Sequence, residues 1–442
     1  MTARDDLGLH LTGADAKSRE AYARALRQFQ CYIGDPVASI NGAIAESPGF
    51  TMAHVFKAYM HLLGTEPAGF AVARECLASA SALKADAREA AHIAAADALA
   101  NSRWHEASRR LEDIAIAEPL DILALQAGHG IDFFTGHARM LRDRIARALP
   151  AWDTSMPGYH ALLGMHAFGL EEMGDYAQAE RQGRAGVALE PRDGWAWHAV
   201  AHALEMQGRF QDGIAWLESG REIWPRESFF AVHNWWHLAV YHLEAGDLHA
   251  ALSLFDGPIN GARSTVILEM IDASAMLWRL HLRGVELGTR WNALADNWST
   301  VADAGNYAFN DAHAMMAFVG AGRRDDQARV LAAQDRAMAR DDDNAAFTRE
   351  VGRPVTLAIQ AFGRGHWAEA FDRLRGVRSI AARFGGSHAQ RDLIDLTMLE
   401  AAIRAGEANF ADALAAERLA AKPASPPARL FAERIAAMPR PR

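Results

Sequence analysis

Apolar residues recur along most of the chain at the three- and four-residue spacing that gives a helix one hydrophobic face. The stretch 194–225 has the clearest pattern, because aromatic and small residues recur there in register around a glycine and before a proline. The residues at these positions are Trp197, Ala201, Gly208, Phe210, Gly213 and Pro225. The pattern predicts two amphipathic helices with a turn at the central glycine, the second helix ending near the proline.

The same pattern returns along the chain in phase. The preceding unit ends at Pro191, 34 residues before Pro225, and a 34-residue period is typical of tetratricopeptide repeats. Turn glycines of other units are Gly64, Gly174, Gly246, Gly322, Gly365 and Gly406. Since one helical hairpin cannot bury its apolar face alone, neighbouring hairpins must stack. We therefore predict an all-α superhelix, a tetratricopeptide-type solenoid of about eleven helical hairpins.

This solenoid is expected to occupy most of the chain. We predict an N-terminal lead over residues 1–16, a continuous solenoid over 17–421, and a short Pro-rich basic tail over 422–442. The stretch 264–304 fits as a longer hairpin with a degenerate pattern. A solenoid grows by stacking, so this length does not require several separate cores.

Composition and charge narrow the function. The formal net charge of −9 and the lack of a basic stripe argue against nucleic-acid binding. With two cysteines, a disulfide framework or a cysteine zinc site is not expected. We find no secretory pattern near the N-terminus and no apolar run of spanning length, so we expect a cytoplasmic protein without membrane association. Phosphate-binding and dinucleotide-binding glycine loops are absent, as is the nucleophile elbow of α/β-hydrolases, so no nucleotide cofactor is implied.

The first helix of each such hairpin lines the concave groove, and two neighbouring first helices carry histidines there. His198, His202 and Glu205 form one stripe with i, i+4, i+7 spacing. The next first helix presents His233, Trp236 and His237 to the same groove. Packed helices lie about 8–10 Å apart. We therefore predict that four imidazoles and one carboxylate converge.

Further polar residues fall at positions that favour a site. Asn310, Asp311 and His313 occupy a later first helix, and Asp272 lies two turns before Arg279 on one helix face. The latter two could form a structural salt bridge or contact a ligand. Ser387 is expected to cap a helix whose first turn holds Arg391 and Asp392.

The histidines are candidates for acid/base catalysis, because a neutral imidazole can act as a general base and a neighbouring carboxylate can orient it. Histidines at i, i+4 can also share a metal, here zinc or another divalent ion on His198, His202 and His237. The candidate catalytic residues are His198, His202, Glu205, His233, His237, Asp311 and His313. The candidate ligand-binding residues are Trp236, Asp272, Arg279, Asn310, Arg391 and Asp392. The alternative is structural, with each histidine hydrogen-bonded between helices.

Several polar stretches together resemble the tetratricopeptide repeat protein 38 family of bacteria and animals. They are 198–206, 233–237, Asp272 with Met276, 310–313, and 386–392. The resemblance covers nearly the whole chain, with His388 as a departure where animal relatives are expected to carry Asn. It implies the solenoid fold and one shared polar site, and it names no reaction.

Two functions remain open from the sequence. The first is a histidine-rich pocket in the concave groove that binds a small molecule, with acid/base or metal-assisted chemistry of a hydrolase- or lyase-like kind. The second is a protein- or peptide-binding scaffold without catalysis, the usual role of such arrays. The sequence leaves the oligomeric state open.

Overall fold

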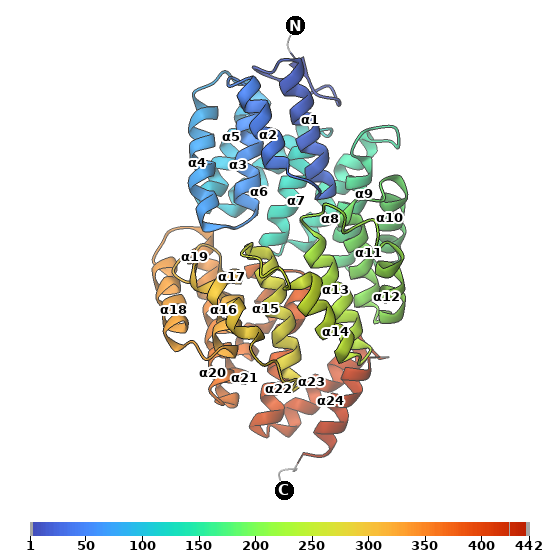
Figure 1. Cartoon of the computed structure of the whole chain (residues 1–442), viewed down its shortest axis with the longest axis vertical. Coiled ribbons are helices and arrows are strands. Elements are labelled where there is room, and N and C mark those ends of the chain that lie inside the picture. The colour runs from blue at the N-terminus through green and yellow to red at the C-terminus, as the bar shows by residue number, and fades with distance from the viewer. Residues whose placement is uncertain (1–2, 424, 439–442) are drawn as a thin grey trace. The chain divides into compact units, whose positions relative to one another are not determined.

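Paired antiparallel helices follow one another through nearly the whole chain (Figure 1). The structure is a computed structural model and describes residues 3–423 and 425–438. The first helices of the pairs are α1 (Ala16–Cys31), α3 (Thr51–Leu63), α5 (Ala87–Ala100), α7 (Ile122–Phe134), α9 (Tyr159–Glu172), α11 (Gly194–Met206), α13 (Ala231–Glu244), α15 (Ile267–Leu282), α17 (Ala308–Gly320), α20 (Arg353–Gly363) and α22 (His388–Ala405). The predicted all-α fold is confirmed.

The second helices complete the pairs. They are α2 (Pro36–Glu46), α4 (Pro67–Ser81), α6 (Trp104–Ala117), α8 (Ala138–Ala148), α10 (Tyr176–Leu189), α12 (Phe210–Ser219), α14 (Leu248–Leu254), α16 (Arg290–Ser299), α18 (Arg324–Met338), α21 (Trp367–Val377) and α23 (Ala408–Ala421). Eleven pairs are present in the described residues, which is the number that the repeat phasing predicts.

Some elements lie outside this pairing. Strands β1 (Ala3–Arg4) and β2 (His10–Leu11) form a small antiparallel ladder in the predicted N-terminal lead. Short helices η1 (Leu149–Ala151), η2 (Phe255–Ile259), α19 (Asp343–Phe347), η3 (Thr348–Gly352) and η4 (Arg378–Phe384) extend individual hairpins. The predicted tail contains helix α24 (Pro426–Ala436), which has Ser425 as its side-chain N-cap. Residues 424 and 439–442 of that segment lie outside the described residues.

The predicted turn glycines adopt the backbone conformation that ends a first helix. Positive φ angles occur at Gly174, Gly208, Gly246, Gly322, Gly365 and Gly406. This left-handed conformation is easily reached only without a side chain. The hairpin of α3 and α4 differs, because Gly64 has φ −71° and the next residue, Thr65, has φ 55°.

The chain divides into two compact units. The first comprises Met1–Ala203 and Gly220–Ala231, and the second comprises Leu204–Ser219 and Val232–Arg442. Helix α11 contributes residues to both. In the first unit α3 packs against α4, α5 and α7, so first helices lie beside one another as stacking requires. Among the described residues, no helix is long and apolar enough to cross a membrane.

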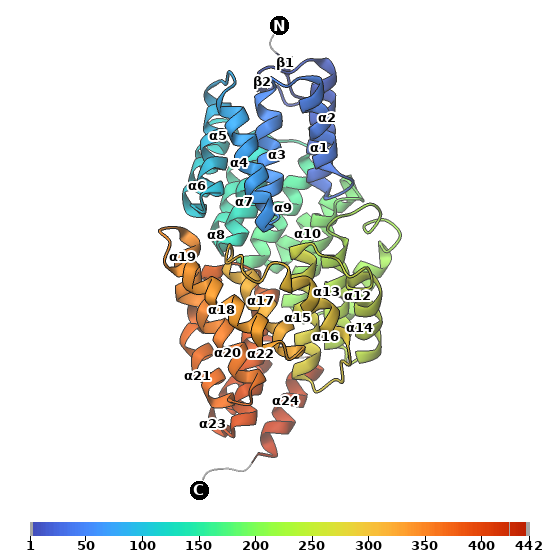
Figure 2. The ribbon, with the colours of Figure 1, turned by 60° about the vertical axis from the view of Figure 1, so that its left-hand side comes forward.

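In the second unit, four first helices form a closed ring of contacts. Helix α15 packs against α17, α17 against α20, and α20 against α22, which in turn contacts α15. Figure 2 shows α15, α17, α20 and α22 gathered together, from yellow to red. The indole Nε1 of Trp278 on α15 donates to Thr397 Oγ1 on α22 at 2.9 Å. The side chains between these helices are consequently enclosed within the second unit.

Candidate functional site

Two histidines of α13, one helical turn apart, each pair with a carboxylate from a neighbouring first helix. Nδ1 of His233 lies 2.8 Å and 3.0 Å from the two carboxylate oxygens of Asp272 on α15. Nδ1 of His237 lies 3.0 Å from Oε2 of Glu205, in the last turn of α11. An ionised carboxylate can only accept, so each Nδ1 carries the proton and each Nε2 is the basic ring atom. We call these two pairs the carboxylate–histidine dyads.

The two dyads are close to one another, and the His237–Glu205 dyad is the more deeply buried, since His233 is 14% exposed. The His237 side chain is 0% exposed and that of Glu205 is 2% exposed. The ring centroids of His233 and His237 are 4.9 Å apart. Three consecutive first helices of the solenoid supply these residues, since stacking brings such helices side by side. This arrangement orients two imidazoles, of which that of His237 is removed from solvent.

Asp272 and Arg279 do not pair with each other, and a ligand contact of either side chain remains a prediction. Asp272 accepts from His233 instead, and Arg279 NH2 donates to the Ala389 carbonyl at 2.6 Å. Arg279 NH1 lies 3.3 Å from Oδ2 of Asp392 on α22. Residues two turns apart share a helix face but are separated along its axis. The neighbouring helices therefore supply nearer partners for both side chains.

Trp236 connects the dyads with Arg279. Its ring stacks against His233 at a centroid distance of 5.5 Å and an interplanar angle of 7°. The guanidinium carbon of Arg279 lies 5.6 Å from the centroid of the Trp236 ring. A cation over an aromatic face is attracted by the ring quadrupole. That Trp236 faces the groove and contacts a ligand remains a prediction.

Helix α17 contributes two groups whose pKa values move in opposite directions. Burial raises the pKa of Asp311 to about 7, against a hydrogen bond from Gln334. Burial lowers the pKa of His313 to about 4, and its Nδ1 donates to the Phe309 carbonyl at 2.8 Å. The charge of Arg279 lowers the His313 value further. Asn310 is also buried. Burial therefore favours the neutral form of both side chains.

In the first unit, His198 and His202 are neighbours on α11. Their ring centroids are 4.4 Å apart, and the ring of His198 stacks on that of Phe168 at 5.3 Å. Nδ1 of His202 lies 3.4 Å from Oε2 of Glu171 on α9. His233 and His237 belong to the second unit. The convergence of all four imidazoles, and a metal on His198, His202 and His237, remain predictions.

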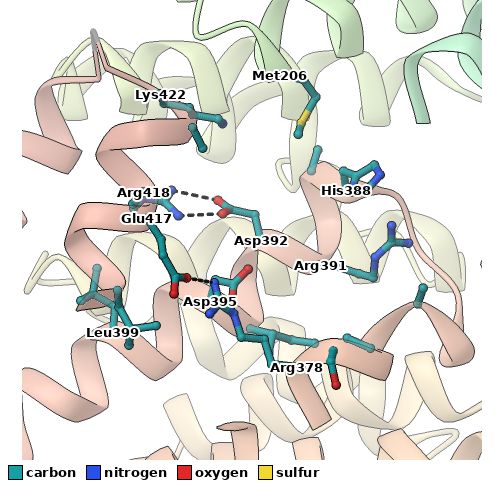
Figure 3. Close-up of a pocket in the computed structure, with 17 residues that line it drawn as sticks. Met206, Arg378, His388, Arg391, Asp392, Asp395, Leu399, Glu417, Arg418 and Lys422 are labelled. Atoms are coloured by element: carbon teal, nitrogen blue, oxygen red, sulfur yellow. Dashed lines mark hydrogen bonds and ion pairs between the residues drawn. The ribbon is translucent and has the colours of Figure 1, made fainter. Parts of the chain in front are cut away.

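A cavity of about 390 Å³ lies in the second unit, lined mainly by α22, α23 and η4 (Figure 3). Arg418 reaches from α23 to bind Asp392 through two hydrogen bonds, at 2.7 Å and 3.0 Å. Although burial alone would raise the pKa of Asp392, the Arg418 guanidinium holds it well below its usual range. Burial, helped by the charge of Asp392, raises the pKa of Asp395 one turn later. The cavity wall thus holds two carboxyls with different proton affinities.

Two of the predicted ligand-binding residues, Arg391 and Asp392, line this cavity, and helix α22 begins there as predicted. Ser387 accepts from the Gln390 backbone, and the Gln390 side chain accepts from the Ser387 backbone. Three other cavity residues, Met206, Arg418 and Lys422, are not among the predicted ligand-binding residues. Arg418 lies on α23, the second helix of its hairpin. The prediction considered only first helices as lining the groove, so it did not include this residue.

Comparisons with known proteins concern the fold. No family model matches the chain. Solved structures with some likeness include the APC/C hetero-tetramer Cut9–Hcn1, with 10% identity, 86% of this chain and 76% of that chain covered, and TM-score 0.38. A monomeric mutant of IFIT1 with Gppp-AAAA has 13% identity, 96% and 95% coverage, and TM-score 0.40. The human IFIT1 dimer with m7Gppp-AAAA has 12% identity, the same coverage, and TM-score 0.41. The fold assignment rests on the paired helices described above, and the resemblance to the tetratricopeptide repeat protein 38 family remains a prediction.

Proposed function

We propose that the second unit binds a small molecule and that the carboxylate–histidine dyads perform acid/base or metal-assisted chemistry on it. The observation that carries this proposal is the dyad of His237 and Glu205, which is almost completely removed from solvent. Burying ionisable groups is costly even when they are paired, and apolar residues of similar volume often stabilise a protein more. A scaffold that recognises proteins through its surface has no need of such a pair.

The dyads have the chemistry of an oriented base. The Nδ1–H of each imidazole is held by a carboxylate, so Nε2 can accept a proton while the carboxylate stabilises the imidazolium. The same arrangement orients histidines that bind a metal through Nε2. Asp311, with a pKa of about 7, is suited to exchange a proton at neutral pH. These residues support a hydrolase- or lyase-like reaction.

The cavity beside α22 supports a ligand of small size. Its volume of about 390 Å³ is within the range of small-molecule sites. Met206 on its wall directly follows Glu205 in α11, and Asp392 on its wall binds Arg279. Arg391, Arg418 and Lys422 give the wall a cationic component that suits a ligand carrying an acid group.

Native mass spectrometry of the gently purified full chain tests this proposal. We expect an added mass of a few hundred daltons, as a cavity of this size predicts, and expect it to be lost from His237→Gln and Glu205→Gln. His249→Gln, at an exposed position of α14, is the matched control and should keep the mass. Retention of the ligand by both dyad variants would refute the proposal. Wild-type protein that carries only a protein partner would favour the scaffold alternative.

A further inference from the structure

A thiol, an imidazole and a carboxylate from three separate helix ends meet in the first unit. Cys31 is the last residue of α1, His160 lies in the first turn of α9, and Asp193 directly precedes α11. Nδ1 of His160 lies 2.7 Å from Oδ2 of Asp193, and Nε2 of the same ring lies 4.0 Å from Sγ of Cys31. All three residues belong to the first unit. We call this group the Cys31–His160–Asp193 triad.

The contacts of His160 assign a role to each member of the triad. An ionised carboxylate only accepts, so Nδ1 of His160 carries the proton and Nε2 is the atom that can take the thiol proton. Asp193 is buried, and its Oδ1 accepts from the Ala196 backbone N–H at 2.9 Å, which holds the carboxylate in place. Contacts between catalytic groups are often long without substrate and shorten when it binds. Nucleophile, base and orienting group are the three parts of an activated cysteine.

Charges around the triad strengthen its base and keep its thiol protonated. Although burial alone would lower the pKa of His160, the hydrogen bond and charge of Asp193, with the charge of Glu190, raise it. Burial raises the pKa of the Cys31 thiol well above its usual range, and the nearby carboxylates act in the same direction against the charge of Arg192. The resting thiol is therefore neutral, and its proton must pass to His160 as the sulfur attacks.

Cys31 and His160 line one cavity of about 320 Å³, which is within the range of small-molecule sites. Arg24 and Arg27 line it too, and they precede Cys31 on α1 at the i, i+3, i+7 spacing that places side chains on one helix face. Arg27 has an exposed ion pair with Asp6 at 3.7 Å, a kind of pair that contributes little to stability. Both guanidinium groups can therefore turn to an acid group on a ligand.

The remaining charges of this cavity leave it positive on balance. They are Glu190, Arg192 and Glu227, and the last two pair with each other at 3.0 Å. Two arginines of α1 thus stand against one remaining carboxylate, that of Glu190. A ligand with an acid group fits this balance better than a cationic ligand does.

We propose that the Cys31–His160–Asp193 triad is a second reactive site, where Cys31 attacks the acyl carbon of a small ester that carries an acid group. The bond from Sγ to the acyl carbon forms as the thiol proton passes to His160 Nε2. The bond to the leaving alcohol oxygen then breaks, and that oxygen takes the proton from His160. Water next attacks the thioester, giving its proton to His160, and the acid leaves as the sulfur regains a proton.

Asp193 is a positioning residue in this scheme, since it acts through His160. The net reaction is ester plus water to acid plus alcohol, and it needs no further reactant. The triad does not rest on the proposed function, because the dyads lie in the second unit.

The test supplies the full chain with 4-nitrophenyl acetate or with the 4-nitrophenyl monoester of succinic acid, which carries an acid group. Release of 4-nitrophenolate gives the acylation rate, and mass spectrometry of peptides from quenched samples locates the acyl group. Wild-type protein should carry it on Cys31, whereas Cys76, the buried cysteine of α4 in the same unit, should stay unmodified. Cys31→Ala should abolish the reaction. An acyl group found only on other residues of the wild type would overturn the proposal.

The role of His160 is tested by its variants and by pH. His160→Gln should lower the acylation rate about a hundredfold. Asp193→Asn should lower it less, because asparagine retains the oxygen that accepts from Ala196. His137→Gln, at an exposed position of the same unit, is the control and should react as wild type. Equal rates for wild type and His160→Gln would overturn the proposal.

The pH profile of the wild type decides the question even where His160→Gln folds poorly. The acylation rate should rise with pH as His160 loses its proton and should level off above the raised pKa of that ring. A rate that rises into alkaline solution without a plateau would mean that the thiol ionises unaided, and would overturn the proposal.

The acid group of the substrate is tested at α1. Arg24→Gln and Arg27→Gln should each lower the rate with the succinate monoester several-fold more than the rate with the acetate ester. Equal losses with the two esters would contradict recognition of an acid group by these arginines.

Discussion

Nδ1 of His237 on α13 lies 3.0 Å from Oε2 of Glu205 on α11, and this hydrogen bond joins two hairpins through buried ionisable side chains. The bond fixes the ring orientation of His237, since an imidazole held at Nδ1 can present only Nε2 elsewhere. Its contribution to stability can be separated from its role in chemistry. The cost of removing one partner differs from the cost of removing both.

Glu205→Leu should lower the free energy of unfolding by about 1–3 kcal/mol, because it leaves the His237 Nδ1–H buried without its acceptor. The double variant Glu205→Leu/His237→Leu should recover part of that loss, since the stranded donor is gone. Denaturant unfolding of wild type, both single variants and the double variant gives the coupling energy. If the losses simply add, the two side chains do not stabilise the fold as a pair.

The pH dependence of stability should report Asp311. Its pKa of about 7 in the folded chain is above the unfolded value near 4. The folded state therefore holds this proton more tightly. The associated stability is present at low pH and is lost as pH rises from about 4 through about 7. Asp311→Asn should consequently melt several degrees above wild type at about pH 8 and close to it at about pH 4. A constant difference between the two proteins across this range would contradict the assignment.

The cavity wall depends on the pairing of Arg418 with Asp392. Asp392→Leu should destabilise the chain by about 2 kcal/mol, because Arg418 then loses the acceptor of its two hydrogen bonds. Arg378→Gln removes the ion pairs with Asp395 and Glu417, whose side chains are all more than one-third exposed, and should cost under about 1 kcal/mol. Denaturant midpoints of the two variants provide the comparison. Equal losses would mean that burial does not distinguish these pairs.

The start of α22 should be sensitive to its cap. Ser387→Ala removes the side-chain acceptor for the Gln390 backbone N–H and should cost about 1 kcal/mol. Ser387→Thr retains a hydroxyl and should cost less. Thermal melts of both variants check this, with helical content measured at low temperature to show that the fold persists. A loss of the same size in both would indicate that packing, rather than the hydrogen bond, determines the preference.

The hairpins could be predicted from the sequence because their signals are local and repeat. A glycine such as Gly208 ends a first helix through its own backbone freedom, so the same residue marks the same turn in each repeat. Departures from the repeat have no such signal. Thr65 takes over the left-handed position after Gly64, and α24 follows the last repeat with its own cap at Ser425. The helix propensities within one hairpin therefore do not predict an altered turn such as that at Thr65 or an extra helix such as α24.

Helical spacing predicts which polar residues share a helix face, but it does not predict which residues of other helices they contact. Helical spacing placed His233 and His237 on one face of a first helix, where the structure has them paired with carboxylates. Spacing along one helix does not specify lateral neighbours, so the partner of Asp272 was missed. The contact of Glu171 with His202 was not predicted, because Glu171 lies near the end of α9, outside the repeat positions used to find groove residues.

The contact of α15 with α22 has a consequence for how the chain acquires its structure. The bond from Trp278 to Thr397 joins residues 119 positions apart, whereas the two helices of one hairpin are near neighbours in sequence. Hairpins can form quickly and locally, but a contact of this range carries a larger loop-closure entropy and forms late. During synthesis, the contact between α15 and α22 cannot form until α22 has left the ribosome. Arg279 lacks its Ala389 acceptor during that interval and gains it only once α22 has been made.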